Sequence, residues 1–128
     1  MIPFNGVYAG RRVLVTGHTG FKGSWLVLWL LQLGAEVAGY SDEVPTTPSN
    51  FELAGLAGRM HHYLGDIRDR ARLATVIDEF RPEVVFHLAA QALVRRSYAD
   101  PATTFETNTM GMVNVLECVR TRPWIEVA

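Results

Sequence analysis

The feature that most constrains this chain is a glycine-rich segment, Gly17–Gly23, placed between two apolar segments. The run Val13–Val15 before it is apolar and mostly β-branched, which predicts a short buried strand that ends at Thr16. The apolar segment after it, Ser24–Leu33, is long enough for a helix, and Gly34 can cap its C-terminus. A strand, a glycine turn and a helix in this order predict a binding site for the phosphates of a nucleotide.

The three glycines of the turn have separate roles in this prediction. Gly17 allows the tight exit from the strand, Gly20 lets the backbone approach a pyrophosphate, and Gly23 lets the helix pack closely on the sheet. The first N–H groups of the helix and its dipole then attract the phosphates. The spacing excludes a P-loop, because that motif places its lysine directly after the last glycine, whereas Lys22 precedes Gly23 here.

The rest of the chain alternates between the two kinds of secondary structure. We expect strands at residues 13–16, 36–40, 60–64 and 84–88. We expect helices at residues 24–33, 69–80 and 103–120, with one or two helical turns inside 51–57. This alternation predicts right-handed crossovers and a parallel sheet in the order 3-2-1-4, the first half of a Rossmann-type doubly wound α/β fold. Residues 1–128 would form one incomplete dinucleotide-binding domain, with a stub at 124–128 where a further strand could begin.

Two details of the helices carry their own expectations. The helix at 24–33 is apolar nearly all round, which predicts that it is covered on more than one side. Cys118 lies within the apolar pattern of the last helix, so we expect it in the core. That last helix also carries Met110, Met112, Val113, Leu116 and Val119, which give it an apolar surface.

Composition excludes several classes of function. The net charge is −1, so no basic excess points to nucleic acid. The longest apolar run, Trp25–Leu31, is far shorter than the roughly 20 residues that a membrane span needs. A lone cysteine and the absence of a signal-peptide pattern predict a cytoplasmic protein. His61 and His62 would point to opposite faces of a strand, so we expect no shared metal site.

A Rossmann site usually has an acidic residue about 20 residues beyond its glycines, where it binds the ribose hydroxyls. The candidate is Asp42, although Tyr40 and Ser41 occupy the end of the strand itself. Asp42 can therefore be a ribose ligand or a solvated loop residue. No arginine pair follows this strand to hold a 2′-phosphate, which favours NAD over NADP.

Five segments together carry a resemblance to a known family. They are Thr16–Leu26, Gly65–Asp69, His87–Gln91, Val94–Tyr98, and Thr107-Asn108 with Gly111 and Asn114. In combination they resemble the extended short-chain dehydrogenases/reductases that act on nucleotide sugars. Within that family they are most similar to the 4,6-dehydratases that act on CDP-glucose.

The resemblance implies a cofactor-binding role for residues in four parts of the chain. In the turn these residues are Gly17, Thr19, Gly20, Phe21, Lys22 and Gly23. Asp66 and Ile67 would hold the adenine, although Asp66 could also simply begin a turn. The segment after the fourth strand would run along the ribose and nicotinamide; it comprises Leu88, Ala89, Ala90 and Gln91. Thr107 would contact the cofactor from the last helix, and Asn108 would brace the loop after the fourth strand.

The resemblance also implies an oligomer. In the family, helices in this region pair across a dimer interface as a four-helix bundle. Together with the apolar surface of the last helix, the resemblance therefore implies a homodimer or a larger oligomer.

Four residues have open interpretations, and Lys22 is one of them, because its ammonium could lie near the phosphates or only extend along the surface. His18 could touch phosphate or only water, whereas His87 is expected to be a core histidine with satisfied hydrogen bonds. Arg95 and Arg96 could bind a phosphate of the sugar nucleotide, because guanidinium suits bidentate contact. They could equally be solvated or lie at a subunit interface.

The resemblance also implies a reaction for the whole enzyme. Hydride leaves C4 of CDP-glucose, water is lost across C5 and C6, and hydride returns to C6 to give CDP-4-keto-6-deoxyglucose. The family's Tyr-x-x-x-Lys pair is not in this chain, because Tyr98 is followed four positions later by Ala102. We therefore expect no catalytic residue here and no activity from the chain alone. Another extended-family epimerase or GDP-mannose dehydratase, and a non-catalytic dinucleotide-binding module, stay open as alternatives.

Overall fold

Four parallel strands form one sheet in the order β3-β2-β1-β4, in a computed structural model that describes residues 2–128. The strands are β1 (Arg12–Thr16), β2 (Glu36–Ser41), β3 (His61–Leu64) and β4 (Val84–His87). Each pairs in parallel with its neighbour, so Thr16 at the end of β1 lies between Tyr40 of β2 and His87 of β4. The predicted α/β class and strand order are confirmed.

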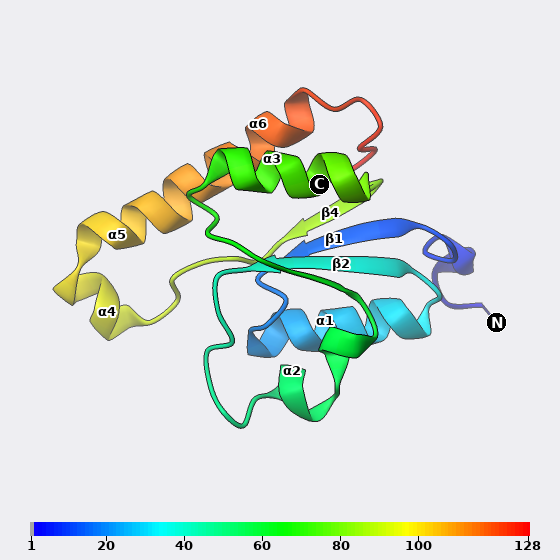
Figure 1. Ribbon diagram of the computed structural model, residues 1–128, viewed down its shortest axis with the longest axis horizontal. Coiled ribbons are helices and arrows are strands. Elements are labelled where there is room, and N and C mark those ends of the chain that lie inside the picture. The colour runs from blue at the N-terminus through cyan, green and yellow to red at the C-terminus, as the bar shows by residue number, and fades with distance from the viewer. Residues whose placement is uncertain (1) are drawn as a thin grey trace.

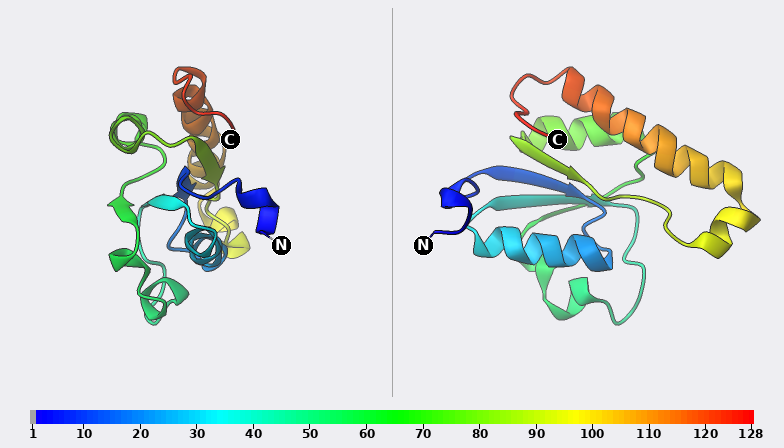
Figure 2. Two further views of the ribbon diagram at one scale, coloured as in Figure 1. Left: turned by 90° about the vertical axis from the view of Figure 1, so that its right-hand side faces the viewer. Right: turned by 180° about the vertical axis from the view of Figure 1, so that it is seen from behind.

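Helices cover both faces of this sheet (Figures 1 and 2). On one face lie α1 (Phe21–Gln32) and α2 (Asn50–Leu53), which is followed by a 3-10 turn at Leu56–Gly58. On the other face lie α3 (Arg70–Phe80) and α6 (Gly111–Arg120). Each face therefore has its own core. A second 3-10 turn, Pro3–Gly6, precedes the sheet.

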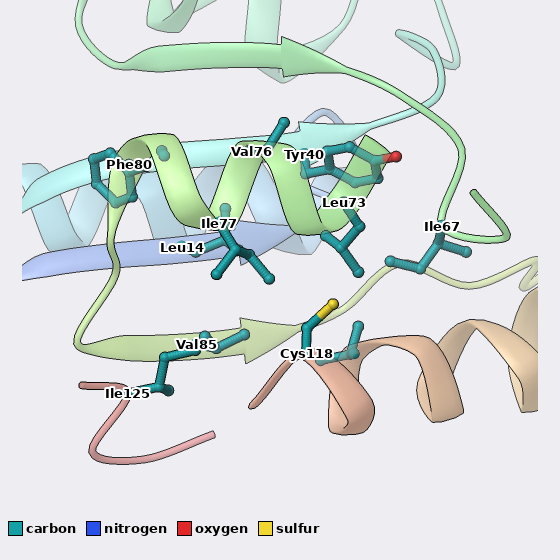
Figure 3. Close-up of a cluster of buried hydrophobic side chains, with 12 residues drawn as sticks. Leu14, Tyr40, Ile67, Leu73, Val76, Ile77, Phe80, Val85, Cys118 and Ile125 are labelled. Atoms are coloured by element: carbon teal, nitrogen blue, oxygen red, sulfur yellow. The ribbon is translucent and has the colours of Figure 1, made fainter. Parts of the chain in front are cut away.

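The α3 side shows how the local sequence builds one of these cores. Asp69 caps the helix, its carboxylate accepting from the backbone N–H of Arg72 at 3.0 Å. The helix then places its apolar residues at helical spacing on the face that meets the sheet (Figure 3). These buried residues are Leu73, Val76, Ile77 and Phe80. Cys118 of α6 lies in the same cluster, which confirms its expected core position.

The first helix differs from its prediction in two ways. It begins at Phe21 rather than Ser24, so Gly23 lies inside the helix. Its outer face is also open among residues 2–128, because Phe21, Trp25 and Trp29 are all more than half exposed. The expectation that this helix is covered on more than one side is therefore wrong for the described residues. An apolar pattern shows that a surface can be buried, but only the tertiary structure shows what lies against it.

The long helix predicted at 103–120 is present but interrupted. It begins as α5 (Pro101–Phe105), passes through a π-helical segment, Glu106–Met110, and continues as α6 to Arg120. The connection from β4 also holds a short helix that was not predicted, α4 (Val94–Ala99). A π-helical insertion of this kind is frequent at functional sites, because it turns side chains out of the regular register.

The C-terminal residues occupy the position of a further strand. Val127 pairs in parallel with Val84, and the N–H of Val85 donates to the carbonyl of Val127 at 3.0 Å. Ile125 is buried in the α3 cluster. The predicted strand stub is therefore confirmed as an isolated bridge on the outer edge of β4. Among residues 2–128, no helix combines the length and apolar character needed to cross a membrane.

Candidate functional site

The glycine turn lies where β1 ends beside β4. Gly17 has φ +76°, and a Cβ atom at this position would stand 2.8 Å from the backbone nitrogen of Ala89. A Cβ atom on Gly23 would overlap the carbonyl oxygen of Gly17. Both positions therefore require glycine. Gly17 needs it for its positive φ and for the close backbone of Ala89, and Gly23 needs it so that the helix can pack closely on the turn.

The beginning of α1 faces the open side of this turn. The first helical hydrogen bond runs from the N–H of Ser24 to the carbonyl of Gly20 at 2.9 Å. The N–H groups of Phe21, Lys22 and Gly23 precede that bond and have no acceptor within the helix. A Cβ atom on Gly20 would meet only the carbonyl oxygen of Gly17, at 3.4 Å, so the space over Gly20 is open. Unpaired N–H groups beside open backbone form a cradle that suits a phosphate.

The two residues inside the turn point into the protein instead. His18 is fully buried and hydrogen-bonds His62 of β3 at 2.7 Å, so neither open interpretation, phosphate or water, describes its side chain. Thr19 is also buried, and its hydroxyl bonds Ser41 at 2.7 Å and the carbonyl of Glu43. The side chain of Thr19 therefore faces β2, so only its backbone is free to contact a ligand at the turn.

The carboxyl end of β2 presents one exposed acid and one buried ring. Asp42 directly follows the strand with an exposed side chain, so it can reach a ligand that lies across this edge of the sheet. Tyr40 is fully buried, and its hydroxyl donates to the carbonyl of Asp66 at 2.7 Å. Burial, followed by the field of Asp69, raises the pKa of Tyr40 to about 12, so the phenol stays protonated. Tyr40 thus fixes the loop after β3.

That loop carries Asp66 and Ile67. Asp66 is part-exposed, and its carboxylate accepts from the Arg68 guanidinium at 2.7–3.1 Å and from the Arg68 backbone N–H at 2.8 Å. Arg68 lowers the pKa of Asp66, so this group is a carboxylate near neutral pH. Asn114 donates to the carbonyls of Ile67 (3.0 Å) and Arg68 (3.2 Å) and so fixes the loop from α6.

The end of β4 is connected to the end of β1 through one hydroxyl. Thr16 Oγ1 accepts from the N–H groups of Leu88 (3.1 Å) and Ala89 (3.2 Å). It also lies 2.7 Å from Nδ1 of His87, to which it can donate its proton. Burial lowers the pKa of His87, which fits a neutral ring with Nδ1 as acceptor. His87 is therefore hydrogen-bonded as expected, but it is only part-buried and does not lie in the core.

The segment after Ala89 is braced from the π-helical segment. Asn108 accepts from the backbone N–H of Gln91 at 2.7 Å and donates to its carbonyl at 3.0 Å, which confirms the expected brace. The Gln91 side chain is engaged with Leu93 and Thr104, so it serves this loop. Ala90 is exposed, and Thr107 is half-buried beside Asn108.

Most of the expected site residues lie together at one edge of the sheet, and two arginines do not. The glycine turn, Asp42, the loop at Asp66 and the segment Leu88–Gln91 all follow the carboxyl ends of strands, at one edge of the sheet (Figure 1). This edge includes the switch point between β1 and β4, where doubly wound sheets bind ligands. Arg95 and Arg96 are exposed on α4, outside this set, and both of their interpretations stay open.

Sequence reasoning missed three groups at this site. The Thr16 hydroxyl was hidden at the end of an apolar strand, although a polar residue in that position is itself a signal. Arg68 sits two residues after Asp66, a spacing at which a fork on the carboxylate can form. The partnership of His18 with His62 had no signal in the sequence, because the two residues are 44 positions apart.

Comparison with known proteins agrees with this geometry. The sequence pattern of the GDP-mannose 4,6 dehydratase family matches residues 14–126. The chain is 56% identical to a CDP-glucose 4,6-dehydratase from Salmonella typhimurium over 113 residues, which are 88% of this chain and 32% of that protein. It is 41% identical to a UDP-glucose 4-epimerase from Mycolicibacterium smegmatis, over 85% of this chain and 34% of the relative.

A solved structure shows the same fold. The UDP-glucose 4-epimerase of Thermus thermophilus, solved in complex with NAD, matches with a TM-score of 0.77 and 39% identity over 87% of this chain and 34% of that one. The chain thus spans about a third of the length of the proteins it matches. With its Rossmann-type sheet, its glycine turn and this sequence match, the chain belongs to the GDP-mannose 4,6 dehydratase family of nucleotide-sugar enzymes.

Proposed function

We propose that this chain is the N-terminal, NAD-binding part of a nucleotide-sugar 4,6-dehydratase that acts on CDP-glucose. The observation that carries the proposal is the cradle at the switch point, where the open N–H groups of α1 face the free space over Gly20. The substrate is inferred from the relative named CDP-glucose 4,6-dehydratase, whose 56% identity exceeds the 41% of the named epimerase.

The residues of the cradle would bind and orient the dinucleotide. The backbone N–H groups of Phe21, Lys22 and Gly23 would donate to the pyrophosphate. The Lys22 ammonium, which is exposed at the same helix end, would add positive charge there. Asp42 would accept from the ribose hydroxyls of the adenosine half.

The adenine and the nicotinamide would lie at opposite sides of the turn. Asp66 and the N–H of Ile67 would pair with the adenine edge, on the β3 side. The backbone of Leu88–Ala90 and the side chain of Thr107 would line the nicotinamide half, on the β4 side. When bound, NAD supplies the acceptor for hydride from C4 of the sugar and the donor that reduces C6. This chain's residues bind and orient the dinucleotide, and the residues that move protons on the sugar are expected outside it.

The cofactor assignment is tested by titrating NAD and NADP by calorimetry into the full-length protein. NAD should bind more tightly, because Asp42 would repel a 2′-phosphate and no arginine pair follows β2. Equal or tighter binding of NADP would overturn the assignment.

The reaction is tested by supplying CDP-glucose, UDP-glucose and GDP-mannose separately to the same protein. Formation of a 4-keto-6-deoxy sugar from CDP-glucose, with no net consumption of NAD, is the expected result. Epimerisation of UDP-glucose without loss of water would instead establish the epimerase alternative. Binding of NAD without turnover of any of the three sugars would favour a non-catalytic module.

We also propose that the protein forms a homodimer through the helix at 103–120. Four apolar side chains on its outer surface are between 39% and 54% exposed. They are Met110, Met112, Val113 and Leu116. An apolar strip of this kind along one helix suits packing against a second copy of the same helix.

A further inference from the structure

His18 and His62 form a hydrogen-bonded pair beneath the glycine turn. Nε2 of His18 lies 2.7 Å from Nδ1 of His62, and the ring centroids are 4.9 Å apart. His18 is fully buried and His62 is partly buried. Phe51 of α2 packs against both rings, at 5.4 Å from His18 and 5.0 Å from His62 between centroids. The pair therefore connects the turn after β1 to the middle of β3.

The fold leaves space for this pair at one position of β2. A Cβ atom on Gly39 would overlap three atoms of the His18 ring. Any other residue at 39 would displace the ring, so the buried position of His18 requires glycine at 39. Nδ1 of His18 is buried with no hydrogen-bond partner, so the bond from Nε2 to His62 is the ring's only side-chain hydrogen bond. Without His62, both ring nitrogens would be buried and unpaired, which is strongly disfavoured.

The pair is one of three consecutive anchors of the turn. The N–H of Gly17 donates to the carbonyl of Tyr40 at 2.8 Å. His18 bonds His62 of β3, and Thr19 bonds Ser41 of β2 at 2.7 Å. The side chains of His18 and Thr19 therefore both point inward, and only backbone groups of this part of the turn face outward. Donors held in place before the ligand arrives bind it without a further ordering cost.

We propose that His18, acting through His62, is a positioning residue that holds the glycine turn in the shape that receives the cofactor's pyrophosphate. His18 does not itself touch the phosphate. The inference rests on the proposed NAD-binding function. Burial, followed by the field of His62, lowers the pKa of His18 to about 4, and burial lowers that of His62. Both rings are then neutral near pH 7, so one ring donates its N–H to the unprotonated nitrogen of the other.

The test compares substitutions of His62 in the full-length protein. His62→Asn places an amide where Nδ1 stands, so it can keep the bond to His18. His62→Phe fills the space but removes the partner, and His62→Gln moves the amide away from the Nδ1 position. We expect the Kd for NAD to rise about tenfold in His62→Phe, by the loss of one buried hydrogen bond, and to stay within about threefold of wild type in His62→Asn.

A neighbouring histidine supplies the matched control. His61 lies on the opposite face of β3, half-exposed and bound to Glu36, so His61→Phe should leave the Kd for NAD unchanged. If His62→Phe does not fold, His62→Gln gives the same comparison with a polar side chain retained. Binding as tight as wild type in the folded His62→Phe or His62→Gln protein would overturn the proposal, as would an equal loss in His62→Asn.

Nitrogen NMR separates this inference from the proposed function. In the protein without NAD, the 15N shift of His18 Nε2 should change in His62→Phe, together with the amide signals of Gly17 and Gly20, and should be largely restored in His62→Asn. If these NMR changes occur but the wild-type protein binds no NAD, the cofactor proposal is refuted and the anchoring of the turn by His18 and His62 remains supported. Unchanged turn amides in His62→Phe would refute the anchoring itself.

Discussion

Arg68 folds back onto Asp66, and its guanidinium and backbone N–H together make four contacts of 2.7–3.1 Å with the carboxylate. Both partners are about 40% exposed, so the pair is accessible to a ligand. A carboxylate offers about four lone-pair sites. An adenine amino group at Asp66 would therefore share these sites with Arg68 or displace part of the fork.

Asp66→Asn should weaken NAD binding about tenfold while leaving the fold intact. The substitution keeps an oxygen for the Arg68 N–H but removes the charge that strengthens the bond to adenine. Because exposed ion pairs contribute only about 0–1 kcal/mol, the free energy of unfolding should change little. Calorimetric titration with NAD and urea denaturation measure the two quantities. Asp78→Asn, at the exposed carboxylate that Arg122 binds, is the control and should not affect NAD binding.

Alanine at Gly23 should lower the stability of the protein, whereas alanine at Gly20 should weaken NAD binding. Gly23→Ala forces its Cβ onto the Gly17 backbone, which should destabilise the protein by about 1–3 kcal/mol or more. Gly20→Ala meets only one atom at 3.4 Å and should fold normally, but its methyl group would occupy the space proposed for the pyrophosphate. We expect a Kd for NAD at least tenfold higher in Gly20→Ala. Normal NAD binding by a folded Gly20→Ala protein would contradict the assignment of the cradle.

Asn108→Ala should destabilise the protein by about 1–3 kcal/mol, because it leaves the N–H and carbonyl of Gln91 without partners. Asn108→Asp keeps the acceptor for the N–H of Gln91 and should lose less stability than Asn108→Ala. Urea denaturation of both variants measures the difference. Thr109→Ala, at an exposed neighbour, should match wild type. If Asn108→Ala is as stable as wild type, the brace does not stabilise the segment after β4.

The free energy of unfolding should fall as the pH is lowered from about 6.5 toward 4. Burial lowers the pKa of His18 to about 4 and also lowers the pKa of His62 and His87. The unfolded chain takes up protons at the ordinary pKa of 6.5, whereas the folded protein does not, so stability is complete above 6.5 and declines below it. Urea midpoints at about pH 7.5, 6.0 and 5.0 measure the decline before the carboxylates titrate. Constant stability across this interval would contradict the neutral state of the buried rings.

Leu116→Glu should convert a dimer to a monomer, because it places a charge in the strip of exposed apolar residues along α6. Sedimentation equilibrium of the full-length protein measures the mass. Leu53→Glu is the control, because Leu53 is 80% exposed on α2, on the other face of the sheet. A wild-type protein that sediments only as a monomer would refute the dimer.

The sequence predicted the sheet well because its signals are local. Apolar runs, the glycine turn and the Asp69 cap each depend on neighbouring residues, so the four strands and their order followed from alternation. The helix α4 and the π-helical segment were missed because neither has a distinctive local pattern. The start of α1 was misplaced by three residues, because glycine inside a helix is disfavoured unless close packing requires it.

By itself, the sequence therefore determined the fold class, the strand order and the place of the glycine turn, since each follows from residues close together in the chain. Only the tertiary structure decided what the turn's own side chains do. It turned His18 and Thr19 inward, placed Arg68 on Asp66, and set Asn108 against Gln91. The physical reason is that these contacts depend on hydrogen bonds whose direction and burial are settled when the strands and helices pack, mostly between residues 17 to 44 positions apart.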